Sequence, residues 1–309
     1  MNNIVNTGPF VPYGRQSINT LDIEAVVDAL RSEWLTTGPA IDDFEKEFAA
    51  FVRADQAVAV SSGTAALHAI TNALEIGFGD EVIVPSMTFA ATANAVVYQG
   101  GTPVFADVRA DTLLIDPESV SRLITPRTKA VIAMDYAGQP CDYEALRAIT
   151  APRGIRLVAD GCHALGAEYH GCRVGVLAEA TAFSFHPVKH ITTGEGGMVT
   201  MNDATLAQRM RIFRNHGIAT DHRQRSKSGQ WFYEMVTLGY NYRITDFQCA
   251  LGLSQLKRLP AWLERRRAIA RLYDEAFSRS SHVRPVRSAG DVSHAYHLYV
   301  VRLENRDHA

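Results

Sequence analysis

One lysine in this sequence stands in surroundings that are unusual for a charged side chain. Lys189 follows the apolar stretch FSFHPV and precedes ITTGEGG, where a predicted strand at 181–185 gives way to a glycine-rich turn. A lysine held in a dry site has a lowered pKa, and its neutral amine is a nucleophile toward carbonyl carbons. Gly194, Gly196 and Gly197 permit tight turns and close approach that other residues resist. The alternative is an ordinary solvated lysine.

A carboxylate follows another apolar run. Asp160 ends the stretch RLVAD and precedes GCHALGA. Burying a carboxylate costs several kcal/mol unless it is paired or hydrogen-bonded, and His163 is spaced to orient it. Asp160 could equally cap the turn that follows. A metal site built from the cysteines and histidines of residues 162–172 is a further alternative, but their spacing fits no common zinc pattern, so we predict no metal.

Two further features follow apolar runs. Gly63, in SSGTAALH, leads into a helix predicted to begin at Thr64 or Ala65. A glycine turn at a helix N-terminus presents free N–H groups that suit a phosphate, although a plain turn with a hydroxyl cap explains the same residues. Phe89, in PSMTFAATAN, is either a core aromatic or a ring that stacks on a flat ligand.

The elements that must position these residues alternate regularly. Short apolar runs occur at 57–60, 81–84, 103–106, 130–134, 156–159, 181–185 and 198–201. Helical patterns separate most of them, at 64–75, 88–98, 117–124 and 142–149, and two earlier helices are predicted at about 21–32 and after Pro39. This alternation predicts an α/β fold with a mainly parallel central sheet covered on both faces. Ligands bind beyond the carboxyl ends of such strands.

The four features together make a specific combination. A phosphate cradle, an aromatic ring, a buried acid and an apolar-flanked lysine are what pyridoxal 5'-phosphate (PLP) requires. The lysine forms a Schiff base, and the acid keeps the pyridine nitrogen protonated so that the ring accepts electrons. We therefore predict PLP as the cofactor.

The bulk composition limits the partners and the compartment. The chain has 309 residues and a formal net charge of −2, so no strong field draws it to nucleic acid or to a membrane. No stretch resembles a signal peptide or reaches the length of a membrane span. The four cysteines form no CxxC pair, which favours a reducing, cytoplasmic location.

The character of the chain changes near residue 256. A long helix is expected there, interrupted at Pro260, and the strand-like run AYHLYVVRL follows it. The triple arginine Arg265–Arg267 is either a solvated helix face or a patch for an anionic partner, and the solvated face is the simpler reading. We predict a large PLP-binding domain over 1–255 and the start of a small C-terminal domain over 256–309.

The sequence resembles the nucleotide-sugar aminotransferases of the DegT/DnrJ/StrS type, from WLTTGP at 34–39 to HLY at 297–299. The most specific stretches are SSGTAALH, ADGCHALGA, FSFHPVKHITTGEGG, NHGI and LGYNYRITDFQCALGLSQL. The resemblance implies the PLP-dependent transferase fold of the aspartate aminotransferase class. Family members continue for several dozen residues beyond the equivalent of Arg302, so the resemblance also implies a truncated small domain.

Residue roles follow from the resemblance. Lys189 matches the Schiff-base lysine and Asp160 the partner of the pyridinium nitrogen. His163 matches a residue beside the cofactor ring and its phenolic oxygen, and Phe89 the aromatic that stacks on the ring. The implied phosphate contacts are Gly63, Thr64, Ala65 and Ser184.

Two further matches concern the partner subunit and the substrate. Asn241 matches a residue that reaches the phosphate of the neighbouring subunit's cofactor, which implies a homodimer with shared active sites. Thr36 and Thr37 fall near the family's substrate mouth.

The implied reaction is transfer of an amino group, with glutamate as the donor, to C4 of a nucleotide-linked 4-keto-6-deoxy sugar. The motifs look most like those of the pseudaminic acid pathway enzyme, which acts on a UDP-linked N-acetyl sugar. The alternatives are a PLP-dependent sugar dehydratase, which carries histidine in place of Lys189, and a catalytically silent relative. A nicotinamide oxidoreductase is disfavoured because no GxGxxG follows the first predicted strand.

Overall fold

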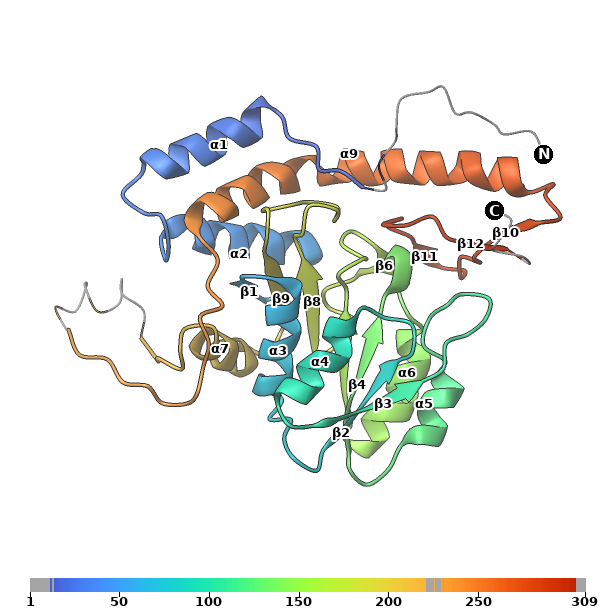
Figure 1. Cartoon of the computed structure of the whole chain (residues 1–309), viewed down its shortest axis with the longest axis horizontal. Helices are drawn as coiled ribbons and strands as arrows, with labels where there is room; N and C mark the ends of the chain where they lie inside the picture. The colour runs from blue at the N-terminus through green and yellow to red at the C-terminus, as the bar shows by residue number, and fades with distance from the viewer. Residues whose placement is uncertain (1–11, 13, 221–224, 226–228, 230, 304–309) are drawn as a thin grey trace.

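The described residues build one seven-stranded sheet with helices on both faces. The structure is a computed structural model, and it describes the chain except residues 1–11, 13, 221–224, 226–228, 230 and 304–309 (Figure 1). The strand order is β1-β9-β8-β5-β4-β2-β3. The strands are β1 (Gln56–Val60), β2 (Glu81–Pro85), β3 (Thr102–Ala106), β4 (Thr128–Met134), β5 (Arg156–Asp160), β8 (Ala180–Ser184) and β9 (Gly197–Met201). Only β9 runs antiparallel to its neighbours, so the expected mainly parallel α/β sheet is confirmed.

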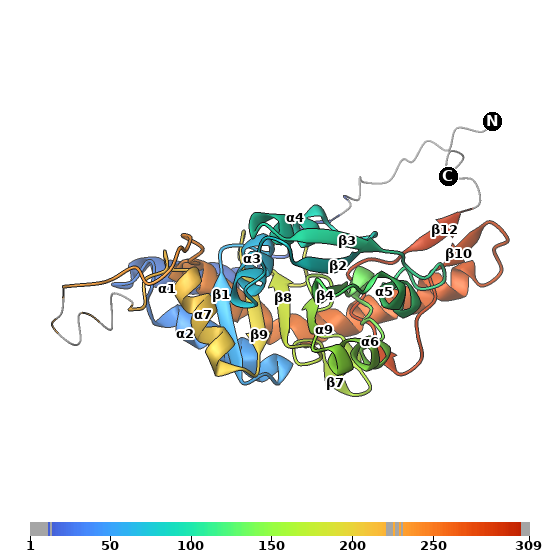
Figure 2. The same cartoon turned by 90° about the horizontal axis from the view of Figure 1, so that it is seen from below.

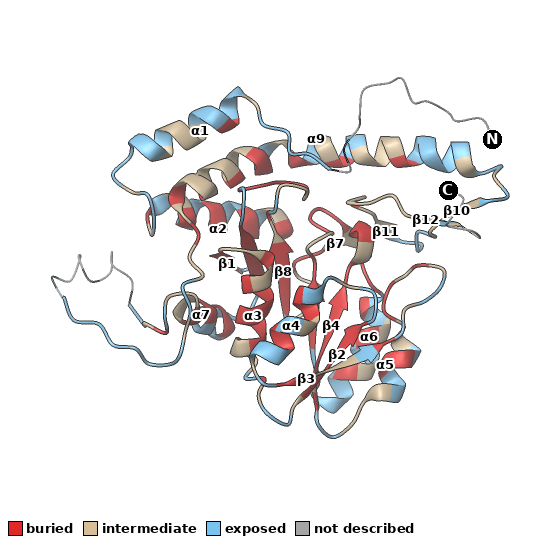
Figure 3. Cartoon of the chain, viewed as in Figure 1, coloured by how far each residue is buried: buried red, intermediate tan, exposed pale blue. Residues whose placement is uncertain are grey.

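Each face of the sheet carries its own hydrophobic core. The helices on one face are α3 (Gly63–Ala73), α4 (Ala90–Tyr98) and α7 (Ala204–Phe213). Those on the other face are α2 (Pro39–Val52), α5 (Pro117–Leu123), α6 (Tyr143–Thr150) and α9 (Asp246–Phe277). Figure 2 shows α4 and α9 on opposite sides of the sheet. Apart from the edge strand β3, the strands between them are almost wholly buried (Figure 3), which explains their continuous apolar sequences.

Capping residues and a proline set where the first two helices begin. Helix α1 (Thr20–Arg31) begins with a reciprocal capping box between Asn19 and Asp22, and α2 begins at Pro39. Ile41, Phe44 and Phe48 of α2 point into the core, as their helical spacing predicts. Two short 3-10 turns, η1 (Tyr136–Gly138) and η2 (Ala151–Arg153), follow β4 and α6 respectively.

Helix α9 continues through Pro260, so the predicted interruption there is wrong. A proline inside a helix costs about 3 kcal/mol, because it lacks an N–H and clashes with the preceding turn. Leu256, Leu259 and Leu263, on either side of it, are all buried in the core and offset that cost. The helix therefore crosses residue 255, where we expected a domain boundary, and the division into two domains stays a prediction.

Small antiparallel elements lie beside the end of α9. Strands β10 (Val283–Pro285) and β12 (Val301–Leu303) pair with each other. Strand β11 (Val292–Ser293) pairs with β6 (Glu168–Tyr169), which also pairs with β7 (Cys172–Arg173). Of the strand-like run predicted near residue 300, only β12 is a strand. Within the described residues, no helix combines the length and the apolar composition needed to cross a membrane.

Residues 294–298, here called the strap, run between β11 and β12 without forming a strand. Arg266 and Arg267 of α9 donate hydrogen bonds to backbone carbonyls of the strap, at 3.0 and 3.1 Å. We expected a solvated helix face at this triple arginine. Only Arg265 is exposed, so that expectation is wrong for the other two. Their sequence neighbourhood gave no signal, because the carbonyls they bind come from a distant segment.

Candidate active site

Three chain segments converge at the carboxyl edge of the sheet. Strand β5 ends at Asp160, β8 ends at Ser184, and α3 begins at Gly63 after β1. A Cβ atom added to Gly63 would lie only 2.9 Å from Ser184 Cβ and 3.3 Å from Cys162 Sγ. Glycine is therefore required at this position, and the predicted phosphate cradle lies directly beside the ends of β5 and β8.

The first turn of α3 retains unused backbone donors. Ser62 caps the helix by accepting a hydrogen bond from the Ala65 N–H at 3.1 Å. Gly63 and Thr64 open the helix, where N–H groups have no intrahelical acceptor and the helix dipole is positive. The hydroxyl cap and the anion-binding geometry, weighed above as alternatives, coexist here.

Asp160 is buried and held by two hydrogen bonds. Thr92 of α4 donates from Oγ1 to Asp160 Oδ2 at 2.8 Å, and the Cys162 N–H donates to Oδ1 at 3.2 Å. These groups take the orienting role that the sequence suggested for His163. Thr92 was missed by the sequence analysis. Its signal was the i, i+4 spacing from Thr88, whose hydroxyl lies 2.6 Å from that of Thr92.

Lys189 lies on the turn after β8 and is partly buried. Its backbone N–H donates to the His186 carbonyl at 2.9 Å, which closes the turn. Burial lowers the pKa of the Lys189 amine, and the nearby Cys162 and Asp160 partly oppose that shift. The amine is therefore more readily deprotonated than a solvated lysine, as the apolar flanks predict.

Three imidazoles surround this lysine. The ring of His163 lies 4.3 Å from that of His297 and 6.1 Å from that of Tyr136, measured between centroids. Burial lowers the pKa of His163 and of His190 to about 3, and the Lys189 charge adds to both shifts. Burial likewise lowers the pKa of His297. All three rings are therefore neutral at physiological pH.

Phe89 precedes α4 at the same edge and is 71% exposed. Of the two interpretations of Phe89 that its sequence leaves open, the core aromatic is therefore wrong. Its ring is accessible to a flat ligand, which is the position that the resemblance implies.

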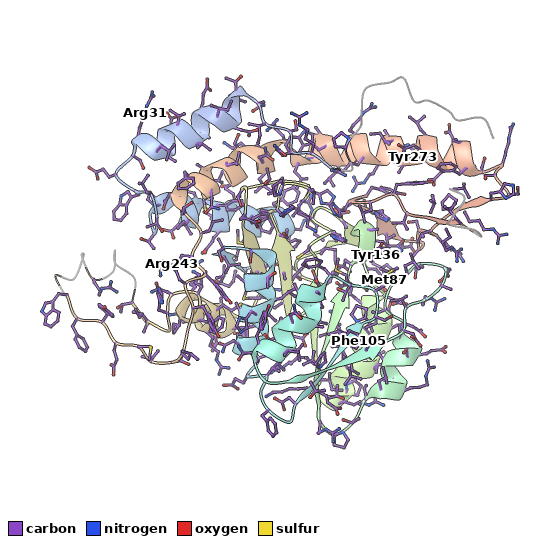
Figure 4. All side chains as sticks on the ribbon, viewed as in Figure 1. Arg31, Met87, Phe105, Tyr136, Arg243 and Tyr273 are labelled. Atoms are coloured by element: carbon purple, nitrogen blue, oxygen red, sulfur yellow. The ribbon has the colours of Figure 1, made fainter. Side chains whose placement is uncertain are left out.

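The remaining predicted residues lie apart from Lys189 within one chain. Thr36 pairs with Thr245 in an isolated bridge, while Thr37 lines a pocket with Arg214 and Arg243. Figure 4 shows Arg243 well separated from Tyr136, which contacts His163. Lys189 does not line this pocket.

Asn241 is exposed and forms an isolated bridge with Asn215. The adjacent Tyr242 carbonyl accepts a hydrogen bond from the Ser61 N–H at 2.8 Å. The segment that carries Asn241 therefore runs beside the start of α3, on the surface of the subunit.

The residues at the carboxyl edge fit PLP. Free N–H groups at a helix N-terminus suit its phosphate, a buried carboxylate suits its pyridine nitrogen, and a lysine of lowered pKa suits its aldehyde. The buried Nδ1 of His163 has no hydrogen-bond partner among the described residues, so a polar group of a ligand can take that place. Among the described residues, no group of histidine, cysteine and acidic side chains is arranged to hold a metal. The fold and the site define a PLP-dependent transferase.

Comparison with known proteins gives the family. Residues 16–309 match the DegT/DnrJ/EryC1/StrS aminotransferase family, and the chain belongs to it. This is a family of PLP-dependent sugar aminotransferases, and the chain is an enzyme of that class. The spore coat polysaccharide biosynthesis protein SpsC of Bacillus subtilis is 43% identical over 298 residues, which cover 96% of this chain and 77% of that protein.

Two solved structures show the same fold. Spr1654 of Streptococcus pneumoniae, solved in PLP and PMP forms, is 36% identical, and its PMP form superimposes with a TM-score of 0.91 over 96% of this chain and 79% of that one. Helicobacter pylori PseC, an aminotransferase involved in the biosynthesis of pseudoaminic acid, is 33% identical with a TM-score of 0.88 over 96% and 78%.

Proposed function

We propose that this aminotransferase moves an amino group from glutamate to C4 of a nucleotide-linked 4-keto-6-deoxy sugar destined for a cell-surface polysaccharide. The names of SpsC and PseC support this class of product. The sequence resemblance to the pseudaminic acid enzyme makes a UDP-linked N-acetyl sugar the first substrate to test. The observation that carries the proposal is the partly buried Lys189 beside Asp160 at the carboxyl edge of the sheet.

We assign a separate role in the reaction to each of the site residues. Bound PLP supplies a carbonyl that accepts the amino group and a ring that takes up electrons. Lys189 would hold the cofactor through its amine, and Asp160 would keep the ring nitrogen protonated. Gly63, Thr64, Ala65 and Ser184 would hold the phosphate, and Phe89 and His163 would lie against the ring.

Lys189 is also the base of the reaction. When not bonded to the cofactor, its Nζ would accept the proton that the α-carbon of the amino donor gives up. His163 is a poor competitor for this role, because burial and the Lys189 charge lower its pKa to about 3. Burial raises the pKa of the Cys162 thiol well above its usual value, so the thiol stays protonated.

The active unit we propose is a homodimer with shared sites. Asn241 is exposed and would reach the phosphate of the partner's cofactor. Five of the six residues at 231–236, all but Glu234, are exposed hydrophobic side chains nearby in the sequence, and Trp231 is 87% exposed. Such a contiguous apolar patch is typical of a protein interface. Thr36 and Thr37 would border the substrate, and the pocket that Thr37 lines also contains the cationic Arg243.

A cytoplasmic location also belongs to the proposal. All four cysteines are unpaired thiols. Unpaired cysteines are typical of proteins in reducing compartments.

The decisive experiment is an amination assay. Purified protein loaded with PLP should be yellow, and glutamate should convert its spectrum to that of the pyridoxamine form. The protein is then offered UDP-, GDP- and dTDP-linked 4-keto sugars, and the aminated product and its position are read by mass spectrometry and NMR. The expected result is C4 amination of one nucleotide series. A protein that takes up PLP but ignores glutamate would favour the dehydratase, and one that takes up no PLP would favour a silent relative.

A further inference from the structure

His163 is oriented by ring contacts rather than by an in-plane hydrogen bond at Nδ1. Its Nδ1 is buried and has no hydrogen-bond partner among the described residues. The nearest aromatic neighbour is His297, with the ring centroids 4.3 Å apart and the planes tilted by 35°. Tyr136 lies farther away, at 6.1 Å. The orientation of His163 therefore depends mainly on what packs against its ring.

The strap holds His297 in place through its backbone. The Ala295 N–H donates to the Gly138 carbonyl at 2.9 Å, and the Leu298 N–H donates to the Ala137 carbonyl at 3.1 Å. The Ala295 carbonyl lies 3.0 Å from His190 Nε2. Together with the two arginines of α9, these bonds fix the strap on both sides of His297.

Gly138 explains how the strap and His163 come so close. Its φ angle is +101°, which favours glycine, and an added Cβ would lie 2.7 Å from the His163 carbonyl oxygen. The same Cβ would lie 3.0 Å from the backbone nitrogens of Tyr296 and His297. The backbones that carry the His163 and His297 rings therefore meet over a residue without a side chain.

We propose that His297 is a positioning residue of the pyridoxal site: its ring, delivered by the strap, packs against His163 and fixes the angle at which His163 meets the cofactor. This inference rests on the proposed function, in which His163 lies against the PLP ring. Neutral aromatic rings attract each other through offset or tilted contacts at this separation. The pKa of each ring is lowered by burial, so the contact is free of charge repulsion.

The role requires a flat ring at position 297 and no particular nitrogen. His297 Nδ1, like that of His163, has no partner among the described residues. A phenylalanine should therefore replace His297, whereas a leucine of similar volume should not. His294 offers a matched control on the same strap. Its ring stacks on Tyr296 at 3.9 Å and not on His163.

The test compares PLP binding in three variants with the wild type. Protein stripped of cofactor with hydroxylamine is titrated with PLP, and the apparent dissociation constant and the visible circular dichroism of the bound cofactor are measured. We expect H297L to bind PLP about two- to tenfold more weakly, the range for one aromatic contact, with reduced dichroism. H297F and the control H294N should stay within about twofold of the wild type.

Several outcomes would overturn the inference. Unchanged affinity and dichroism in H297L would remove any role for the ring, and H297F as weak as H297L would show that a nitrogen is needed. If H297L and H297F both lose cooperative thermal unfolding, His297 contributes only to the packing of the fold. A wild type that borohydride cannot trap with PLP at Lys189 would instead overturn the proposed function, so the two failures are distinguishable.

Discussion

Thr92 Oγ1 donates a 2.8 Å hydrogen bond to Asp160 Oδ2, and both residues are buried. The bond joins the first turn of α4 to the end of β5, so a helix on one face of the sheet orients the carboxylate at its edge. An ionised acceptor makes such a bond stronger than a neutral one. Removal of the Thr92 hydroxyl should therefore weaken the interaction of Asp160 with the cofactor.

The variant T92V should slow the reaction with glutamate by about tenfold to a hundredfold, the range for one hydrogen bond to a charged group. PLP should still attach to Lys189, because no contact to the lysine is removed. The half-reaction is followed by the loss of yellow colour. T71V is the matched control, since Thr71 is equally buried but bonds only the carbonyls of His68 and Ala95. Equal effects in the two variants would reduce the role of Thr92 to stability.

Replacement of Lys189 by alanine should abolish covalent attachment of PLP. Borohydride treatment followed by peptide mass spectrometry should find the cofactor on Lys189 in the wild type and nowhere in K189A. Activity should fall by at least about a hundredfold, because the general base is lost. The adjacent His190 is buried, and its pKa is lowered to about 3, so it should not rescue the variant. Cofactor trapped at another residue would refute the assignment.

Shared sites can be tested by mixing two inactive variants. In a mixed dimer of K189A and N241A, one site carries both defects and the other carries neither. Refolding the two together should therefore restore activity, up to about a quarter of the wild type if subunits pair at random. Each variant alone is the control. No recovery from mixtures that size-exclusion chromatography shows to be dimeric would mean that Asn241 serves the site of its own subunit.

Asp135 makes the stability of the protein depend on pH. It is fully buried at the end of β4, and it accepts hydrogen bonds from Tyr143 Oη and the Cys141 N–H. Burial raises the pKa of its carboxyl to about 7. Between about pH 4 and pH 7 the folded state thus keeps a proton that the unfolded chain has lost. This group then lowers stability as pH rises, by up to about 1.4 kcal/mol per pH unit.

The variant D135N should remove that contribution, since its amide cannot titrate and its single carbonyl oxygen, at the Oδ1 position, can accept from both the Cys141 N–H and Tyr143 Oη. Urea unfolding of wild type and variant at pH 5 and pH 7.5 should show D135N gaining stability relative to the wild type at the higher pH. Comparison with the wild type cancels the opposite contribution of the buried histidines, which favour folding as pH rises toward 6.5. Parallel pH profiles would refute the raised pKa.

Local sequence was sufficient for the sheet and for the ends of its strands. All seven apolar runs became strands, because central strands buried on both faces must be apolar throughout, and the apolar edge strand β3 pairs with one of them. Lys189 and Asp160 were recognisable because a charged side chain beside an apolar strand is costly to bury unless it is paired or has a function. The direction of β9 was not predictable, since an antiparallel strand buried on both faces has the same composition.

Contacts between distant segments escaped the sequence analysis. Thr92, His297 and the two strap-binding arginines act on residues far away in the chain, and only Thr92 had a local signal, its spacing from Thr88. The predicted interruption of α9 at Pro260 was wrong for a related reason. The tendency of proline to end a helix was overridden by buried leucines whose packing partners lie on other elements.

Helix α9 also has a consequence for the order of events during synthesis on the ribosome. Its Gln255 donates to the Ser17 carbonyl, 238 positions earlier, and accepts from the Thr192 N–H, 63 positions earlier. The strap, which leaves the ribosome later still, completes the surroundings of Lys189. The N-terminal segment and the lysine turn therefore cannot complete these contacts until α9 and the strap have been translated, and apolar surface stays exposed on the nascent chain during that delay.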